Sequence, residues 1–185
     1  MPRLNGEQLA EELGELYEQV PATCCASSGE CCFLTEKEME EGYATMFPLY
    51  RAEYLNIVRW VGEKFPGEKR EELLAVTEER PRRCPFLAGE NRCSIYPVRP
   101  LICRTYGVMT PSAIAEAVER HEGEVPERWL RGFAVREGGM VCPRVMVTQP
   151  AKLARHASNL ITSAYERALV RLGGKVELVE GEERQ

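Results

Sequence analysis

The sequence lacks any long apolar run. A helix needs about 20 consecutive apolar residues to cross a bilayer, and no uncharged apolar stretch here approaches that length. The N-terminal segment MPRLNGEQLAEEL also has no apolar run after its arginine, so we expect no signal peptide. These absences predict a soluble, cytoplasmic protein that does not bind membranes.

Excess positive charge and familiar catalytic motifs are also missing. The net charge of -5 argues against general affinity for nucleic acid. No Ser-His-Asp order, phosphate-binding glycine loop or paired-carboxylate motif stands out, and the glutamates are spread in a pattern typical of solvated helix faces. The two histidines, His121 and His156, are interpreted as surface or packing residues. The sequence therefore leaves open whether the protein is an enzyme.

The remaining pattern predicts a single-domain, mainly α fold with irregular cysteine-bearing loops and at most a small hairpin. The chain has 185 residues, which is enough for one domain with its own core. Residues 1–174 are predicted to form this metal-binding domain, and residues 175–185 a flexible acidic tail. Helical spacing and capping residues predict helices over residues 5–20, 35–42, 48–65, 68–79, 101–106, 111–121 and 150–172. Between residues 123 and 141 we expect one helical turn at 127–131 and then a glycine-rich loop.

Cysteine is the residue that the chain has in unusual number and arrangement. Four of its eight cysteines fall within the segment TCCASSGECC, as Cys24, Cys25, Cys31 and Cys32. The small residues between the two pairs allow a loop that turns several sulfurs toward one point. In a reducing compartment such a cluster is more often metal-binding or redox-active than disulfide-bonded.

The other cysteines, Cys84, Cys93, Cys103 and Cys142, occur later in the chain. Cys84 and Cys93 flank a Gly-Glu-Asn turn signal, so a hairpin-like loop can bring both thiols to one centre. Six arginines and only one glutamate lie between residues 80 and 104. Their positive charge favours thiolate over thiol and would stabilise an anionic metal centre. We therefore expect these distant cysteines to meet Cys31 and Cys32 in space.

Thiolates select zinc, copper(I) or iron–sulfur clusters. Four ligands suffice for a structural zinc ion or for a [4Fe–4S] cluster, and the spacing lacks the regular repeats of ferredoxins and zinc ribbons. The pattern alone does not name the metal. Ordinary buried thiols and a disulfide-based redox switch are the alternatives without a metal.

Several short motifs occur in an order that resembles the YkgJ-like cysteine-cluster family, described as zinc- or iron-chelating domains. They are Gly29 with Cys31-Cys32, then Cys84-Pro-Phe-Leu, Cys93-Ser-Ile-Tyr, Arg99-Pro-Leu-Ile-Cys103-Arg104 and finally Cys142. The resemblance covers about residues 22 to 143. It departs from the family at Cys24 and Cys25, which are adjacent here, whereas the family usually separates its first two cysteines.

This resemblance implies metal binding through the matching cysteines. Flagellin lysine methylases have similar cysteine motifs, which implies an iron–sulfur cluster and protein-modifying chemistry as further options. In this interpretation Arg99 and Arg104 stabilise the anionic centre, while Tyr96 and Pro100 hold the loop. The leading hypothesis is thus an iron or iron–sulfur protein, with [4Fe–4S] favoured. The alternatives are a zinc-stabilised interaction module, which could have a protein partner, and a metal-dependent protein-modifying enzyme.

Overall fold

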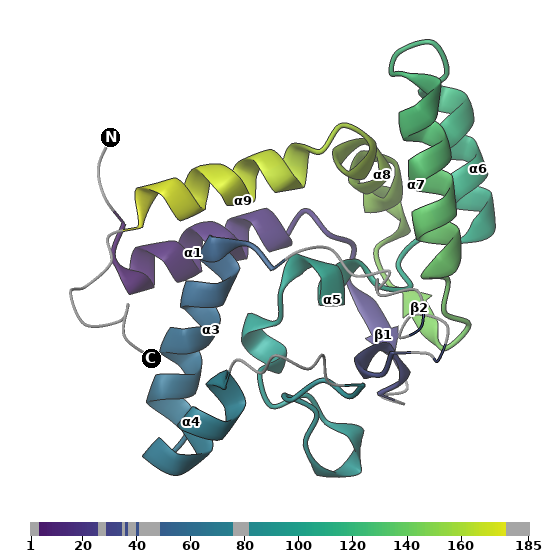
Figure 1. Cartoon of the computed structure of the whole chain (residues 1–185). Helices are drawn as coiled ribbons and strands as arrows, with labels where there is room; N and C mark the ends of the chain where they lie inside the picture. The colour runs from purple at the N-terminus through teal and green to yellow at the C-terminus, as the bar shows by residue number, and fades with distance from the viewer. Residues whose placement is uncertain are drawn as a thin grey trace.

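The structure, a computed structural model, describes residues 4–25, 29–34, 36, 40, 49–75 and 82–176, with Cys25 and Glu30 described by their backbone only. The described chain is mainly helical (Figure 1), which confirms the predicted fold class. The helices are α1 (Gly6–Tyr17), α3 (Arg51–Lys64), α4 (Gly67–Leu74), α5 (Leu101–Thr105), α6 (Pro111–Arg120), α7 (Glu127–Gly139), α8 (Leu153–Ile161) and α9 (Ala164–Lys175). Strands β1 (Thr23–Cys25) and β2 (Val145–Val147) form a small antiparallel sheet. Among the described residues, no helix combines the length and the apolar character needed to span a membrane.

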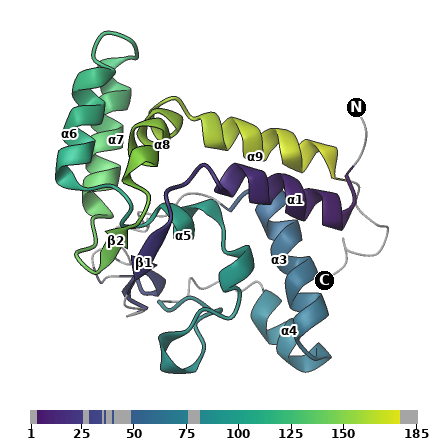
Figure 2. The ribbon, with the colours of Figure 1, turned by 180° about the vertical axis from the view of Figure 1, so that it is seen from behind.

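The helices pack in two groups that share one main core. Helices α1, α3 and α9 contact one another, and α6, α7 and α8 form the second group. The two views of the ribbon show α1 beside α9, with the α6–α7 pair at the other end of the molecule (Figures 1 and 2). Buried residues of α1, such as Leu9 and Leu13, meet Tyr165 and Leu169 of α9 in this core. The small sheet and the segment 82–98 lie on the side of the molecule away from α9.

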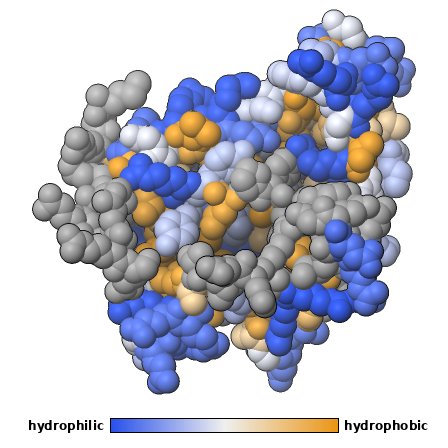
Figure 3. All heavy atoms as spheres, viewed as in Figure 1, coloured by the Kyte–Doolittle hydropathy of each residue, from blue (hydrophilic) through white to orange (hydrophobic). Residues whose placement is uncertain are grey.

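On the face shown in Figure 3, hydrophilic residues cover the projecting ends, and apolar residues show mainly toward the middle. A second, smaller core cluster contains Ile57 and Val61 of α3 together with Leu73, Ile95 and Val98, and Phe86 and Cys93 pack against it. The segment that carries Cys93 therefore packs on a small apolar cluster.

The helix starts that rest on local capping are confirmed. In α1 the Asn5 side chain accepts a hydrogen bond from the Gln8 amide at 2.9 Å, and the Gln8 side chain accepts one from the Asn5 amide at 3.0 Å. In α6 the Thr110 hydroxyl accepts a hydrogen bond from the Ala113 amide at 3.2 Å. Such caps satisfy amides that have no partner within the helix. The helix predicted at 35–42 lies, apart from residues 36 and 40, outside the described residues.

Two predictions in the C-terminal half are wrong. The segment 127–139 forms one continuous helix instead of a single turn and a glycine-rich loop. Its buried face includes Glu137 beside Leu130 and Phe133. Because Glu137 is charged, the buried positions do not show the helical spacing of apolar residues on which the prediction depended. The stretch 150–172 is not one helix, because the chain breaks at Ser163, whose φ is 53°.

The break at Ser163 separates α8 from α9. It lets α8 pack against α6 and α7 while α9 packs against α1 and α3. Gly173 and Gly174 lie inside α9 and do not terminate it. After α9, Val176 forms a parallel bridge with Leu4, which ties the described end of the chain to its beginning.

Candidate metal centre

Backbone hydrogen bonds bring the second cysteine pair beside Cys84. Glu30–Cys32 forms one 3-10 turn, and the carbonyl oxygen of Cys32 accepts a hydrogen bond from the Cys84 amide at 2.7 Å. The Leu34 amide donates to the carbonyl oxygen of Arg82 at 2.9 Å, and Phe33 and Arg83 form an antiparallel bridge. Two segments about 50 residues apart thus run side by side and place their thiols together.

The predicted hairpin carries Cys84 and Cys93 on its two arms. An antiparallel bridge joins Leu87 to Cys93, and the Ala88 amide donates to the Arg92 carbonyl oxygen at 2.8 Å. At its tip Glu90 and Asn91 have φ values of 57° and 56°, a left-handed conformation that asparagine tolerates better than most residues. The turn signal in the sequence therefore has its expected structural role.

Helix α5 supplies Cys103, as predicted. Pro100 precedes the helix, and its carbonyl oxygen accepts the Cys103 amide at 3.0 Å. Burial raises the pKa of the Cys103 thiol to about 12, and the nearby charges of Cys84, Cys31 and Cys93 act in the same direction. Thiols from three chain segments therefore act on one another. Cys31, Cys32, Cys84, Cys93 and Cys103 are called the five-thiol group below.

Within the five-thiol group, hydrogen bonds and burial give the thiols different pKa values. Hydrogen bonds with Cys31 and Cys84 raise the pKa of Cys32. The hydrogen bond from Cys32 lowers the pKa of Cys84 to about 7. Burial raises the pKa of Cys93. Of Cys32, Cys84, Cys93 and Cys103, Cys84 is therefore the thiol that most readily carries the negative charge, and its hydrogen-bonded neighbour Cys32 holds a proton.

The remaining cysteines lie on or next to the small sheet. The first pair was predicted in a loop, but Thr23–Cys25 is strand β1, in which Cys24 pairs with Met146 and Cys25 with Val145. Cys142 precedes β2 and lies against Gly107. A Cβ added at Gly107 would stand 2.9 Å from the Cys142 Cβ. Neither Cys24 nor Cys142 is among the main groups that shift the pKa values of Cys32, Cys84, Cys93 and Cys103. Their role as ligands stays a prediction.

The two arginines expected next to the centre lie beside it. Arg99 acts on the thiols through its charge, which lowers the pKa of both Cys93 and Cys103. Its guanidinium carbon lies 4.2 Å from the centroid of the Tyr96 ring. Arg104 stacks on Tyr17 at 4.1 Å and donates to the carbonyl oxygens of Arg99 and Pro97, each at 2.8 Å. Both guanidinium groups are thus held in place by ring stacking.

Glu53 is a positioning residue that was not predicted from the sequence, because all glutamates of the chain were assigned to solvated helix faces. Its side chain is 1% exposed and accepts hydrogen bonds from the Tyr17 hydroxyl at 2.8 Å and the Leu101 amide at 2.6 Å. Burial raises the pKa of the Glu53 carboxyl. The bond to Leu101 anchors the first residue of α5, the helix that presents Cys103. One signal was available, since residue 53 shares a helical face with the apolar Ile57 and Val61.

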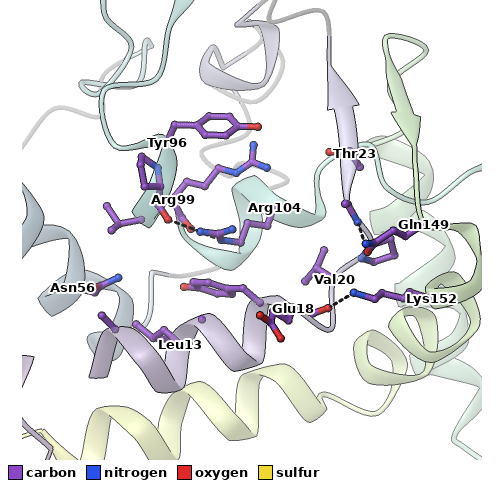
Figure 4. Close-up of a pocket in the computed structure, with 17 residues that line it drawn as sticks. Leu13, Glu18, Val20, Thr23, Asn56, Tyr96, Arg99, Arg104, Gln149 and Lys152 are labelled. Carbon is purple, nitrogen blue, oxygen red and sulfur yellow. Dashed lines mark hydrogen bonds between the residues drawn. The ribbon is translucent and has the colours of Figure 1, made fainter. Parts of the chain in front are cut away.

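A pocket of about 640 Å³ adjoins the five-thiol group through Arg99 and Arg104. One wall is α1, and the opposite wall is the segment from Tyr96 to Arg104 (Figure 4). Gln149 and Lys152 close a third side. Because Arg99 acts on Cys93 and Cys103 and also lines the pocket, the two features share this side chain.

No disulfide bond joins the cysteines in the described part of the chain. The side chain of Cys25 is outside the description. In the part of the chain that the structure describes, no three cysteine, histidine or acidic side chains already stand in positions to hold one metal ion. The donor set nevertheless suits a soft metal, because every member of the five-thiol group is a sulfur ligand. Metal binding would replace thiol protons and thiol–thiol hydrogen bonds with metal–sulfur bonds.

Comparison with known families identifies the region that contains this group. Residues 22–126, more than half of the chain, match the CxxCxxCC family, described as a "putative zinc- or iron-chelating domain". The chain belongs to the CxxCxxCC family. The match confirms the predicted resemblance to a cysteine-cluster family and supports metal binding as the function of the domain. Comparisons with curated proteins and with solved structures found no similar chain.

The CxxCxxCC match includes the whole five-thiol group as well as Cys24 and Cys25, and it ends before Cys142. The structure adds what the family description does not contain. It groups five of these cysteines around the hairpin and α5, with Arg99 between them and the pocket.

Proposed function

We propose that the protein binds iron through its cysteines, as an iron–sulfur cluster for which [4Fe–4S] is the favoured type. The observation that carries the proposal is the five-thiol group, to which three separate chain segments contribute. A [4Fe–4S] cluster needs four cysteine sulfurs, so the group contains enough ligands. When bound, such a cluster would supply one-electron chemistry. The protein's own part would be to hold four thiolates and to balance their charge.

The arginines support the iron–sulfur version. A cluster with four thiolates is anionic, and Arg99 already acts on Cys93 and Cys103. Fixed positive charge next to the sulfurs stabilises the thiolate form and the anionic cluster. A reducing compartment keeps a cluster of cysteines in the thiol form that binds metal, and we propose a cytoplasmic location on that basis.

Zinc is the second candidate, and a different observation favours it. The segment 82–98 consists of turns, bridges and two short 3-10 helices, and only Leu87, Ile95 and Val98 in it are buried apolar residues. Such weakly packed segments commonly depend on a structural zinc ion, whose binding contributes directly to folding. In this version the domain would be an interaction module without redox chemistry.

A metal-dependent enzyme is the third candidate, and the pocket beside Arg99 favours it. Chemistry at a metal requires space for a substrate near the centre. The pocket offers such space on the side of α5. This version predicts that a bound ligand in the pocket changes the spectrum or the metal affinity of the centre.

Anaerobic purification with metal analysis and an absorption spectrum separates the iron–sulfur version from the zinc version. Iron and acid-labile sulfide in equal amounts, together with a charge-transfer band in the visible range, are the expected result. One zinc per chain without such a band would overturn the iron–sulfur version in favour of zinc. A protein that takes up neither metal during reconstitution would contradict metal binding altogether.

A further inference from the structure

The pocket of about 640 Å³ has the size and the build of a small-molecule site. Ligand pockets commonly measure about 300 to 1,000 Å³ and combine apolar walls with a few polar groups. Here the apolar wall consists of Leu13 and Val20 from the first helix and its exit, opposite Val98. The polar groups come from the other sides.

Positive charge predominates among the lining side chains. Arg99, Arg104 and Lys152 line the pocket, and Glu18 is the one carboxylate among the lining residues. Figure 4 shows Arg99 and Arg104 on one side and Lys152 on another, around the same space. Three cations around one space attract an anion and raise its local concentration.

Two of these cations, Arg104 and Lys152, are held by uncharged acceptors. Arg104 donates to two backbone carbonyl oxygens, and Lys152 donates to the carbonyl oxygen of Glu18 at 2.7 Å. Within the described residues, no ion pair joins Arg99, Arg104 or Lys152 to a carboxylate. Glu53 acts on Arg104 through its charge, but it lies behind Tyr17 and does not line the pocket. The positive charge that faces the cavity is thus only partly compensated.

An aromatic ring completes the site. Tyr96 lines the pocket and is 54% exposed, and its ring carries the Arg99 guanidinium. A planar arginine held in this way is suited to bidentate contact with a carboxylate or a phosphate. The exposed parts of the ring and the α1 wall can then contact an apolar portion of the same ligand.

We propose that this pocket binds a small organic anion. Its carboxylate or phosphate group contacts Arg99 and Arg104, Lys152 adds positive charge from another side of the same space, and its apolar portion lies against the wall formed by α1. The proposal stands on the cavity and its charges, and it holds whether the five-thiol group takes iron or zinc. Because Arg99 also acts on Cys93 and Cys103, the ligand would lie directly beside the metal centre.

Isothermal titration of the purified protein with three matched aromatic probes tests the proposal. Phenyl phosphate and benzoate carry an anionic group on the same ring, and phenol is the neutral control. We expect both anions to bind and phenol not to bind, with affinity falling when the ionic strength rises from about 0.02 to about 0.3 M. The tighter of the two anions identifies the phosphate or the carboxylate as the preferred group. The proposal would be overturned if neither anion bound, or if phenol bound as tightly as the anions.

Variants locate the binding to this pocket. Lys152→Gln removes one cation that lines the pocket and is expected to lower the affinity for the tighter-binding anion roughly three- to tenfold. Lys69→Gln makes the same charge change on α4, where Lys69 pairs with Glu72 outside the pocket, and should leave the affinity unchanged. Ala10→Phe fills the cavity from α1 and should abolish binding while the helical circular dichroism is retained. Equal weakening by the two lysine variants, or full binding by Ala10→Phe, would contradict the site.

Discussion

At the scale of single residues, Cys84 interacts with each of the other four members of the five-thiol group. It is hydrogen-bonded to Cys32, acts on Cys93 and Cys103 through its charge, and has its pKa lowered to about 7. We expect Cys84→Ser to weaken metal binding by about 100-fold or more, because a serine hydroxyl is a poor ligand for a soft metal. Metal affinity measured by competition with a chelator checks this.

Cys142→Ser is the matched control for that experiment. Cys142 is also a half-buried thiol, but it lies against Gly107 next to the sheet. If the five-thiol group supplies all the ligands, Cys142→Ser should keep a metal affinity within about twofold of the unchanged protein. A loss of metal as large as that of Cys84→Ser would show that the five-thiol group does not contain the whole site.

His156 gives a prediction about pH at the same scale. Its side chain is fully buried, Nδ1 bonds to the Tyr165 hydroxyl at 2.8 Å, and burial lowers its pKa to about 4. An ordinary histidine has a pKa of about 6.5. Between these values the unfolded chain takes up a proton that folded His156 does not, so this residue's contribution to stability is lost as the pH falls. The loss amounts to about 3 kcal/mol by pH 4.

Chemical denaturation at several pH values checks the prediction. The raised pKa values of Glu53 and Glu137 act with the opposite sign, because these carboxyls stabilise the fold when they are protonated. Only the difference between the protein and the His156→Gln variant therefore isolates the histidine. The two free energies of unfolding should converge as the pH falls from about 6.5 to about 4. Parallel curves would show that His156 does not titrate in this way.

At the scale of elements, the contact between α9 and α3 gives a matched pair of variants. A Cβ added at Gly173 would lie 3.3 Å from the Arg51 Cβ and 3.4 Å from the Ala52 amide nitrogen, whereas one added at Gly174 meets nothing within 4 Å. Gly173→Ala requires Arg51 and Ala52 to yield by a few tenths of an ångström, which offsets the gain in helix propensity and should leave the protein about 1 kcal/mol less stable than Gly174→Ala. Gly174→Ala should stabilise the helix by about 0.5 to 1 kcal/mol. Thermal unfolding measures both, and equal effects would contradict the close approach.

Element by element, the sequence predicted what depends on local chemistry. Asn5 with Gln8 and Thr110 with Pro111 mark helix starts correctly, because a cap is completed within four residues. The turn at Glu90 and Asn91 is equally local. Prediction failed where a distant partner decides the conformation. Strand β1 exists because Thr23 pairs with Val147, and nothing near Thr23 in the sequence announces that partner.

The candidate site shows the same division. Cysteine type and order predicted that Cys84, Cys93 and Cys103 approach Cys31 and Cys32, and the structure has this arrangement. The support from Glu53 and the pocket were not predicted. The role of Glu53 depends on which helix lies against α5, and the pocket depends on which segment lies opposite α1. The packing of α1, α3 and α9 decides both arrangements.

At the scale of the whole molecule, the cysteine site and the main core are built on different apolar clusters. The main core contains buried residues of α1, α5, α6, α7, α8 and α9. The hairpin and the 3-10 turn that follow Cys84 contribute to the smaller cluster of Ile57, Val61, Leu73, Ile95 and Val98. A segment with few buried apolar contacts opens locally at lower free energy than the core. The metal should thus stabilise the segment 84–98 more than the helices.

Metal removal tests this division. After complete chelation we expect the amides of residues 84–98 to lose protection from hydrogen exchange by about 10-fold or more. Amides in α1 and α9 should change little, because their core does not include the hairpin. Circular dichroism should therefore retain most of the helical signal. Loss of the entire helical signal would favour the zinc-dependent module, in which folding and binding are one event. Unchanged protection at 84–98 would show that the metal does not bind at the five-thiol group.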